Sequence, residues 1–217
     1  MRPIVWQTII AVTALLIIVS GTALESISSE SIAHSLFQKH GTYSRITDAD
    51  AKHHQIIGFL GFGKEPDISF LSSDEQSHIQ DVRDILDVFG IIYWGSVILF
   101  LFSAKMLWQA DKTLLKTRLG KALLWTGVVG IALIALLAIA VLIDFNSTFE
   151  LMHKLFFPQG NWQFSMESTL IRIYPEGVFQ GYGTRIITTI LVKLALIAGT
   201  VLTWTKLRRE PRSTLMN

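Results

Sequence analysis

Residues 122–143 read ALLWTGVVGIALIALLAIAVLI and contain no charged side chain. A helix of about 20 apolar residues can cross the hydrocarbon core of a bilayer, because it satisfies its backbone hydrogen bonds internally. Residues 4–23, 88–108 and 186–204 have the same apolar character. All four stretches are about twice as long as the roughly 10 residues of a membrane β-strand, and they do not alternate. We therefore predict an all-α membrane protein with four transmembrane helices in a single membrane domain, residues 1–217.

The composition of the whole chain agrees with a membrane protein. Half of its 217 residues are apolar, 17% are charged, and the mean hydropathy is +0.44, which lies outside the ordinary range of soluble domains. The net charge of +2 averages over two unlike sides of the predicted membrane protein, so no nucleic-acid partner is expected. The chain has no cysteine, which excludes disulfides, thiolate catalysis and iron–sulfur ligation.

The distribution of Lys and Arg predicts the orientation of the spans. Residues 105–121 contain five basic residues against one acidic residue, and residues 206–212 contain four against one. Residues 24–87 contain five against eleven, and residues 144–185 contain three against four. Cytoplasmic loops carry the excess of Lys and Arg. The sequence therefore predicts that both termini are cytoplasmic and that residues 24–87 and 144–185 form two structured loop regions facing outward.

The first predicted span has an alternative interpretation as a secretory signal peptide. Arg2 would be its basic region, and Gly21 and Ala23 lie near a cleavage point. Its apolar run exceeds the usual 7 to 15 residues or so of such a region, which favours a retained membrane anchor.

The segment before the second span carries a candidate histidine. Ser73 and Gln76 fit a capping box, so a helix should begin there and continue unbroken through residues 88–108. His78 and Asp81 are three residues apart and share a face of this helix. Asp81 would then hold the imidazole in one tautomer and favour its protonated form. The alternative is a solvated helix start with an ordinary surface histidine.

The second outer loop carries another candidate histidine. Residues 149–164 read FELMHKLFFPQGNWQF, so aromatic and methionine side chains surround His153. Such a segment suits the headgroup level of a membrane. Residues 158–160 should form a turn, and residues 162–174 are expected to return as a short extended segment that ends at Pro175. The alternative is an interfacial helix with His153 as its polar edge.

Lys193 lies inside the fourth predicted span, about eight residues from its outer end. An ionisable residue within a span is a functional candidate. The alternative is that its side chain extends to the outer interface, since about eight residues correspond to roughly 12 Å of helix.

All six histidines fall in the predicted outer loops, which raises the possibility of outward metal handling. No pair has the close helical spacing of a strong zinc motif, His53 and His54 are adjacent and diverge on a helix, and cysteine is absent. We therefore expect neither a metal nor a cofactor.

Two motifs together resemble a known family. The first is HIQDV at residues 78–82, before the second span, and the second is residues 149–162 followed by LIRIYPEGVF at residues 170–179. They are similar to the lipoprotein intramolecular transacylase (Lit) family of four-helix bacterial integral membrane proteins. The resemblance covers the chain from about residue 74 to the last span and is weaker over residues 25–73.

The resemblance implies an enzyme of the cell membrane with its active-site loops on the extracytoplasmic side. The family moves an acyl chain within a diacylglyceryl lipoprotein, from the glyceryl ester to the amino group of the N-terminal cysteine, which gives a lyso-form lipoprotein. Its partners would be lipidated bacterial lipoproteins and membrane lipid. The two catalytic histidines correspond to His78 and His153, one as a base for the amine and the other as an acid or oxyanion donor. An acyl-enzyme is not required.

Further residues receive supporting roles if the resemblance holds. The acyl or glyceryl end of the pocket would be lined by Phe156, Phe157 and Trp162, and the head group would be served by Arg172 or Tyr174. Asp81 and Lys193 are the remaining supporting candidates. The alternative function is a non-catalytic membrane subunit whose outer loops bind a lipid or a protein partner.

Overall fold

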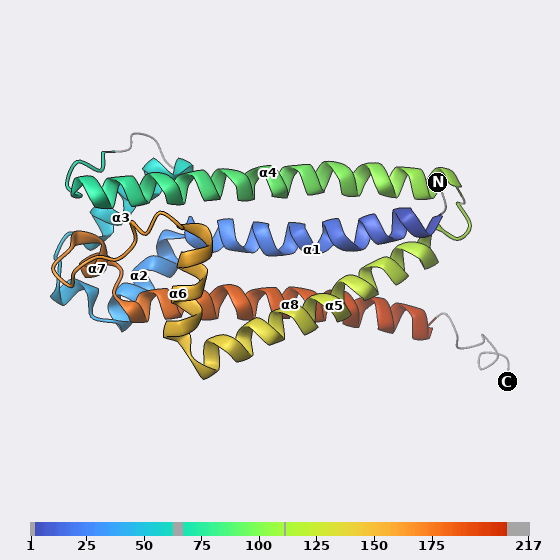
Figure 1. Ribbon diagram of the computed structural model, residues 1–217. Helices are drawn as coiled ribbons and strands as arrows, with labels where there is room; N and C mark the ends of the chain where they lie inside the picture. The colour runs from blue at the N-terminus through green and yellow to red at the C-terminus, as the bar shows by residue number, and fades with distance from the viewer. Residues whose placement is uncertain (1–2, 63–66, 111, 208–217) are drawn as a thin grey trace. The chain divides into compact units, whose positions relative to one another are not determined.

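The computed structural model describes residues 3–62, 67–110 and 112–207 (Figure 1). Every element in these ranges is helical. Four helices are long and apolar enough to cross a membrane, and each contains one predicted span: α1 (Pro3–Ile27), α4 (Ser73–Ala110), α5 (Leu115–Ile143) and α8 (Glu176–Leu207). The prediction of four long apolar helices is therefore confirmed. The limits of the bilayer along each helix remain predictions, and Arg208, Arg209, Glu210 and Arg212 lie outside the described residues.

The chain forms two compact units, which share the four long helices. The first unit comprises residues 1–20, 92–136 and 189–217, and the second comprises residues 21–91 and 137–188. Both candidate histidines belong to the second unit.

Small residues allow close helix packing in the first unit. A Cβ atom at Gly127 would lie 2.8 Å from the Cβ of Ala198 and 3.2 Å from the carbonyl oxygen of Leu194. The hydroxyl of Thr126 donates a hydrogen bond to the carbonyl of Ala11 at 3.0 Å. Glycines and hydroxyl side chains are typical of helix contacts in membranes, where apolar side chains gain little by leaving lipid.

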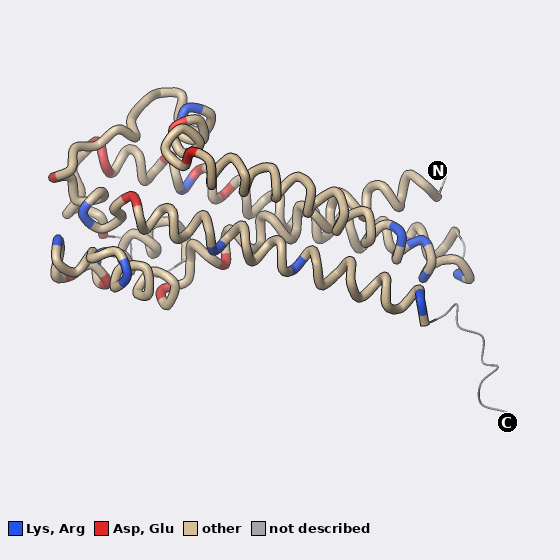
Figure 2. The backbone as a smooth tube through the Cα atoms, turned by 90° about the horizontal axis from the view of Figure 1, so that it is seen from below, with Lys and Arg blue, Asp and Glu red and all other residues tan. Residues whose placement is uncertain are grey.

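The exposed side chains of the first unit are mostly apolar. Trp125, Leu136 and Leu196 are each about two-thirds exposed. The described residues of this unit include no Asp or Glu, and its basic residues include Lys112, at the start of the connection to α5, and Lys206, at the end of α8 (Figure 2). Such a surface suits a lipid environment.

The second unit adds short helices around its own apolar core. These are α2 (Glu30–Lys39), the 3-10 helix η1 (Thr42–Ser44), α3 (Ala49–Ile57), the π-helical turn η2 (Gly58–Phe62), α6 (Phe145–Phe156) and α7 (Thr169–Ile173). Phe37, Ile56, Ile173 and Val178 are at most 1% exposed and lie in one cluster. The two loop regions predicted from the sequence therefore fold into a packed unit without disulfides.

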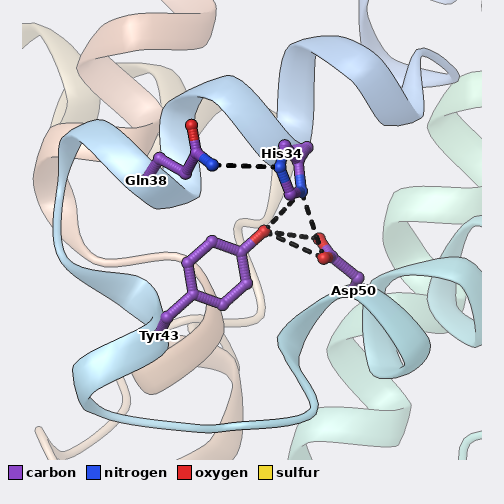
Figure 3. A network of polar contacts seen from close by, with 4 residues as sticks. All are labelled: His34, Gln38, Tyr43 and Asp50. Carbon is purple, nitrogen blue, oxygen red and sulfur yellow. Dashed lines mark hydrogen bonds and ion pairs between the residues drawn. The ribbon is translucent and has the colours of Figure 1, made fainter.

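A polar network joins α2, η1 and α3 within the second unit (Figure 3). The hydroxyl of Tyr43 donates to Asp50 at 2.8 Å, and Nδ1 of His34 lies 3.1 Å from the same carboxylate. With the proton of His34 on Nδ1, its Nε2 accepts from Gln38 at 3.2 Å. Burial, followed by the hydrogen bond and charge of Asp50, raises the pKa of Tyr43 to about 12.

The segment after α6 differs from the sequence prediction. The predicted turn is present, since Gly160 has φ of 81° and its N–H donates to the Phe157 carbonyl at 3.0 Å. The extended segment predicted at residues 162–174 is wrong, because residues 169–173 form α7 instead. The hydroxyl of Ser168 caps this helix by accepting from the Ile171 N–H at 3.3 Å. Serine at this position is a local signal for the start of a helix, and the sequence prediction did not use it.

Candidate active site

The first turn of α4 places the first candidate histidine. The helix begins at Ser73 and runs unbroken to Ala110 as predicted, but its capping box lies one residue earlier than predicted. The N–H of Ser72 donates to the Glu75 carboxylate at 2.8 Å, and the N–H of Glu75 donates to the Ser72 hydroxyl at 3.4 Å. Gln76, the expected partner, instead donates from its side chain to the carbonyl of Leu71 at 2.7 Å.

Glu75 also connects α4 to α7. It is only 3% exposed, and its second carboxylate oxygen accepts from the N–H of Leu170 at 2.8 Å. This bond spans 95 residues of sequence and was not predicted. Because His78 follows Glu75 by almost one helical turn, the same carboxylate anchors the part of α4 that carries the imidazole.

Helix α6 places the second candidate histidine. The Asp144 side chain caps its start by accepting from the Ser147 N–H at 3.0 Å. His153 lies in the last turn and is 7% exposed. Its Nδ1 lies 2.9 Å from the carbonyl oxygen of Phe149. Since a carbonyl only accepts hydrogen bonds, Nδ1 carries the proton and Nε2 of the neutral ring keeps its lone pair.

The structure brings the two candidate histidines together. The rings of His78 and His153 are stacked, with centroids 6.3 Å apart and planes at 24°. Both side chains are buried, and His78 is 9% exposed. Two imidazoles from distant parts of the chain therefore share one site in the second unit.

Four aromatic side chains surround this histidine pair, and we call them the aromatic enclosure: Phe149, Phe157, Trp162 and Phe164. The ring of Phe157 lies 4.7 Å from His78 and 5.5 Å from His153, and Trp162 lies 4.8 Å from His153. Phe157 and Trp162 were predicted to line the site, whereas Phe149 and Phe164 were not. Phe156 is 42% exposed, and no ring contact joins it to either imidazole among the described residues.

Burial keeps both imidazoles neutral. It lowers the pKa of His78 to about 4, and the nearby His153 lowers it further, while the charge of Asp81 acts in the opposite direction. Burial also lowers the pKa of His153, against the bond to the Phe149 carbonyl, which raises it. Asp81 thus favours the protonated form of His78 as predicted, but burial outweighs it.

The contacts of Asp81 differ from those expected. Its carboxylate accepts from the side-chain amides of Gln159 at 2.8 Å and Asn161 at 2.5 Å. Nδ1 of His78 is buried without a hydrogen-bond partner among the described residues, so Asp81 does not fix the tautomer of His78 through this nitrogen. Asp81 instead connects α4 to the turn that follows α6, and the two amide partners were not predicted.

The remaining candidates lie elsewhere. Nε of Arg172 donates to the carbonyl of Arg45 at 3.1 Å, and the hydroxyl of Tyr174 lies 2.7 Å from Nδ1 of His53. These contacts join α7 to the region of η1 and α3, and neither side chain belongs to the aromatic enclosure. Lys193 belongs to the first unit.

The arrangement is suited to proton transfer. Two neutral imidazoles in an apolar surrounding can take, hold and return a proton next to a bound substrate. Within the described ranges, no group of three or more His, Asp or Glu side chains is placed to hold a metal ion. Proton transfer is the chemistry that the two neutral imidazoles can offer.

Comparisons with known proteins identify the family to which the chain belongs. The profile of the family "Lipoprotein intramolecular transacylase Lit" matches residues 4–179. The fold is similar to that of the membrane integral lipoprotein intramolecular transacylase Lit from Bacillus cereus, with a TM-score of 0.83 and 18% identity over 95% of this chain and 97% of that one. Two structures of the same protein, with one histidine replaced by alanine or by arginine, each give a TM-score of 0.76 at 18% identity, over 95% of this chain and 95% or 93% of theirs.

A protein of Aquifex aeolicus (strain VF5), described as uncharacterized, is 32% identical over 102 residues, which is 46% of this chain. The matched region spans 42% of that relative's length. The family match covers most of the chain, including both candidate histidines. The chain therefore belongs to the lipoprotein intramolecular transacylase family, Lit.

Proposed function

We propose that the chain transfers an acyl group within a diacylglyceryl lipoprotein, from the glyceryl ester to the amino group of the N-terminal cysteine. The amine nitrogen attacks the ester carbonyl, an amide C–N bond forms, the ester C–O bond breaks, and the glyceryl oxygen takes the proton that the amine loses. The stacked pair of neutral histidines, with centroids 6.3 Å apart, is the observation that carries this proposal.

His153 is the base in this proposal. An α-amino group has a pKa of about 7.7 to 8.0, so its neutral, attacking form arises after one proton has left to the solvent, and the attacking nitrogen then has a second proton to lose as the amide forms. The bond from Nδ1 of His153 to the Phe149 carbonyl leaves Nε2 as the basic atom. Nε2 takes the amine proton and returns it to the departing glyceryl oxygen, so the ring is neutral again after each turnover.

His78 stabilises the oxyanion in this proposal. Its Nδ1 is buried and has no hydrogen-bond partner in the part of the chain that the structure describes, and an unpaired buried N–H is rarer in proteins than an unpaired acceptor. The proton therefore resides on Nε2, which can donate to the oxygen of the tetrahedral intermediate. Because donor and acceptor groups belong to one substrate molecule, proximity supplies much of the rate.

The aromatic enclosure excludes water from the reacting ester in this proposal. Phe157 contacts both imidazoles, so the acyl carbonyl would meet apolar ring surfaces rather than a competing water nucleophile. Asp81 and Asn161 are positioning residues in this proposal. The hydrogen bond between them holds in place the turn that precedes Trp162.

We further propose that both termini are cytoplasmic and that the histidine pair faces outward. The first unit has basic but no acidic side chains among its described residues, whereas the second unit holds every described Asp and Glu (Figure 2). This asymmetry supports the proposal. A reporter fused after Asn217 or within residues 112–116 should read cytoplasmic, and one within residues 42–50 external. An external C-terminus would contradict this topology.

The proposed reaction can be tested with purified protein and a synthetic diacylglyceryl lipopeptide. Mass spectrometry of the product should show the acyl chain moved to the N-terminal amine, with no loss of mass. His78→Ala and His153→Ala should each remove most of the conversion. Full function of both variants would instead favour a non-catalytic membrane subunit.

A further inference from the structure

A polar pocket separate from the histidine pair lies within the second unit, between α2 and the beginning of α8. Its volume is about 480 Å³, and neither His78 nor His153 lines it. We call it the cationic groove and define it by six of its polar lining residues: Ser31, Ser35, Lys39, Thr184, Arg185 and Thr188. The proposed acyl transfer uses none of these residues.

Helical spacing explains how these side chains meet. Ser31, Ser35 and Lys39 are four residues apart in α2, so they form one stripe along that helix. Thr184 and Thr188 have the same spacing in α8, and Arg185 lies three residues before Thr188. Two polar stripes therefore face one another across the pocket.

Glycines allow α2 to approach α8 closely at this pocket. A Cβ atom at Gly177 would overlap the ring of His40, and one at Gly181 would overlap the side chain of Leu36. Both glycines line the pocket together with their neighbours. The short distance between the helices gives the groove two walls, so that a ligand would be held from both sides.

The groove has two positive charges and no negative one. Lys39 and Arg185 are exposed, and the described lining residues include no carboxylate. The first residue of α8, Glu176, accepts a hydrogen bond from Gln180 at 2.9 Å and is not part of the lining. Nε2 of the lining residue His40 is buried and has no hydrogen-bond partner within residues 3–62, 67–110 and 112–207. A pocket lined in this way favours an anion.

We propose that the cationic groove binds the phosphate of an anionic phospholipid headgroup. Two cations and the hydroxyls of Ser31, Ser35 and Thr184 match a phosphate, which accepts several hydrogen bonds and carries negative charge. The hydroxyl of Thr188 instead donates to the carbonyl of Thr184 at 2.7 Å. Arg185 immediately precedes the apolar stretch predicted to cross the membrane, so the groove lies where headgroups meet the bilayer surface. The diacylglyceryl-cysteine of a lipoprotein contains no phosphate. The ligand proposed for the cationic groove therefore differs from the substrate proposed for the histidine pair.

The proposal can be tested by native mass spectrometry of the detergent-solubilised full chain titrated with dioctanoyl phosphatidylglycerol. Changing both Lys39→Gln and Arg185→Gln should weaken lipid binding at least tenfold. Lys154→Gln is the matched control, because this lysine is exposed in the second unit and pairs with Glu150 at 2.6 Å outside the groove. The charge-preserving pair Lys39→Arg and Arg185→Lys should keep binding, which separates lost charge from lost folding.

Two competitors distinguish the sources of the anion. Inorganic phosphate should displace the lipid only at much higher concentration, because it lacks the contacts of the glycerol and acyl chains with the protein surface. Equal lipid binding by the wild type and the double glutamine variant would overturn the proposal. Tighter, charge-dependent binding of hexaglutamate than of phosphatidylglycerol would also overturn it and assign the groove to an acidic peptide.

Discussion

The imidazoles of His78 and His153 stack at 6.3 Å, although one comes from the start of α4 and the other from the end of α6. Because the two rings lie this close together, one substrate molecule bound beside the pair can be served by both of them. If they act in one proton-transfer sequence, replacing either by alanine should abolish most lyso-form product. The double variant should be little worse, because residues of one apparatus are strongly non-additive.

Conversion of a diacylglyceryl lipopeptide by the two single variants and the double variant measures this coupling. His54→Ala is the control, since that side chain is 69% exposed and contacts Glu30. Losses that multiply in the double variant would mean independent roles, each typically worth about 10² to 10⁴ in rate. Near-normal conversion by one single variant would remove that histidine from the proposed mechanism.

Asp81→Asn should be milder than His78→Ala, with a loss of about 10- to 100-fold, as is usual for groups that orient a site rather than react. Asn161→Ala should give a similar loss because it removes the same hydrogen bond. The two changes together should cost little more than either alone. Equal and total loss in Asp81→Asn and His78→Ala, at unchanged protein levels, would show that Asp81 takes part in the chemistry.

Glu75→Gln should destabilise the protein by about 1–3 kcal/mol, because it removes charge-assisted bonds from buried N–H donors. The amide can present only one oxygen to the N–H groups of Ser72 and Leu170, which now have one carboxylate oxygen each. Thermal unfolding in detergent measures the change. Asp74→Asn is the control, an exposed carboxylate in the same turn whose loss should cost less than about 1 kcal/mol. Equal effects would contradict the anchoring role of Glu75.

Gly127→Ala should destabilise the first unit by about 1–3 kcal/mol, since the added methyl group would press on Ala198 and on the Leu194 carbonyl. Gly199→Ala is the matched helix control, because no atom lies within 4 Å of its Cβ position. That change should be neutral or stabilise by up to about 1 kcal/mol. Unfolding temperatures of both variants check the contrast, and a neutral Gly127→Ala would place the helices further apart than described.

Stability should fall as the pH drops from about 6.5 to about 4. Burial lowers the pKa of His53 to about 4, so in this window the unfolded chain binds a proton that the folded chain does not, and acid favours unfolding. Above pH 6.5 both states are neutral and the effect vanishes. His53→Gln should therefore lose several degrees less in melting temperature across this window than the wild type. If the melting temperatures of this variant and the wild type fall in parallel as the pH drops, His53 does not remain neutral in the folded chain.

The sequence predicts the four helices well because the length of an apolar run is a direct physical requirement of the bilayer. Residues 122–143 and their counterparts each fall within one helix. His78 and His153 could be named only through motif resemblance, since spacing alone allowed ordinary surface or interfacial histidines. Their juxtaposition depends on the packing of α4 against the end of α6, which no local pattern encodes.

The errors in the site have physical causes of the same kind. The bond from Glu75 to Leu170 and the amides that bind Asp81 join segments far apart in sequence, so no periodicity could indicate them. Phe156 and Phe157 are adjacent and equally apolar, yet only Phe157 is buried. Which of these two side chains is buried depends on the residue at which α6 ends. The end of a helix can shift by one or two residues, so the sequence does not determine this choice.

The aromatic enclosure has a consequence for inhibitors. None of its four side chains carries a hydroxyl or a thiol, and the whole chain lacks cysteine. Maleimides, which disable cysteine acyltransferases by covalent capture, would find no thiol in this chain. On the proposed mechanism, a compound that blocks the reaction would instead be a reversible mimic of the tetrahedral intermediate, with an anionic oxygen for His78 and a cationic centre for His153.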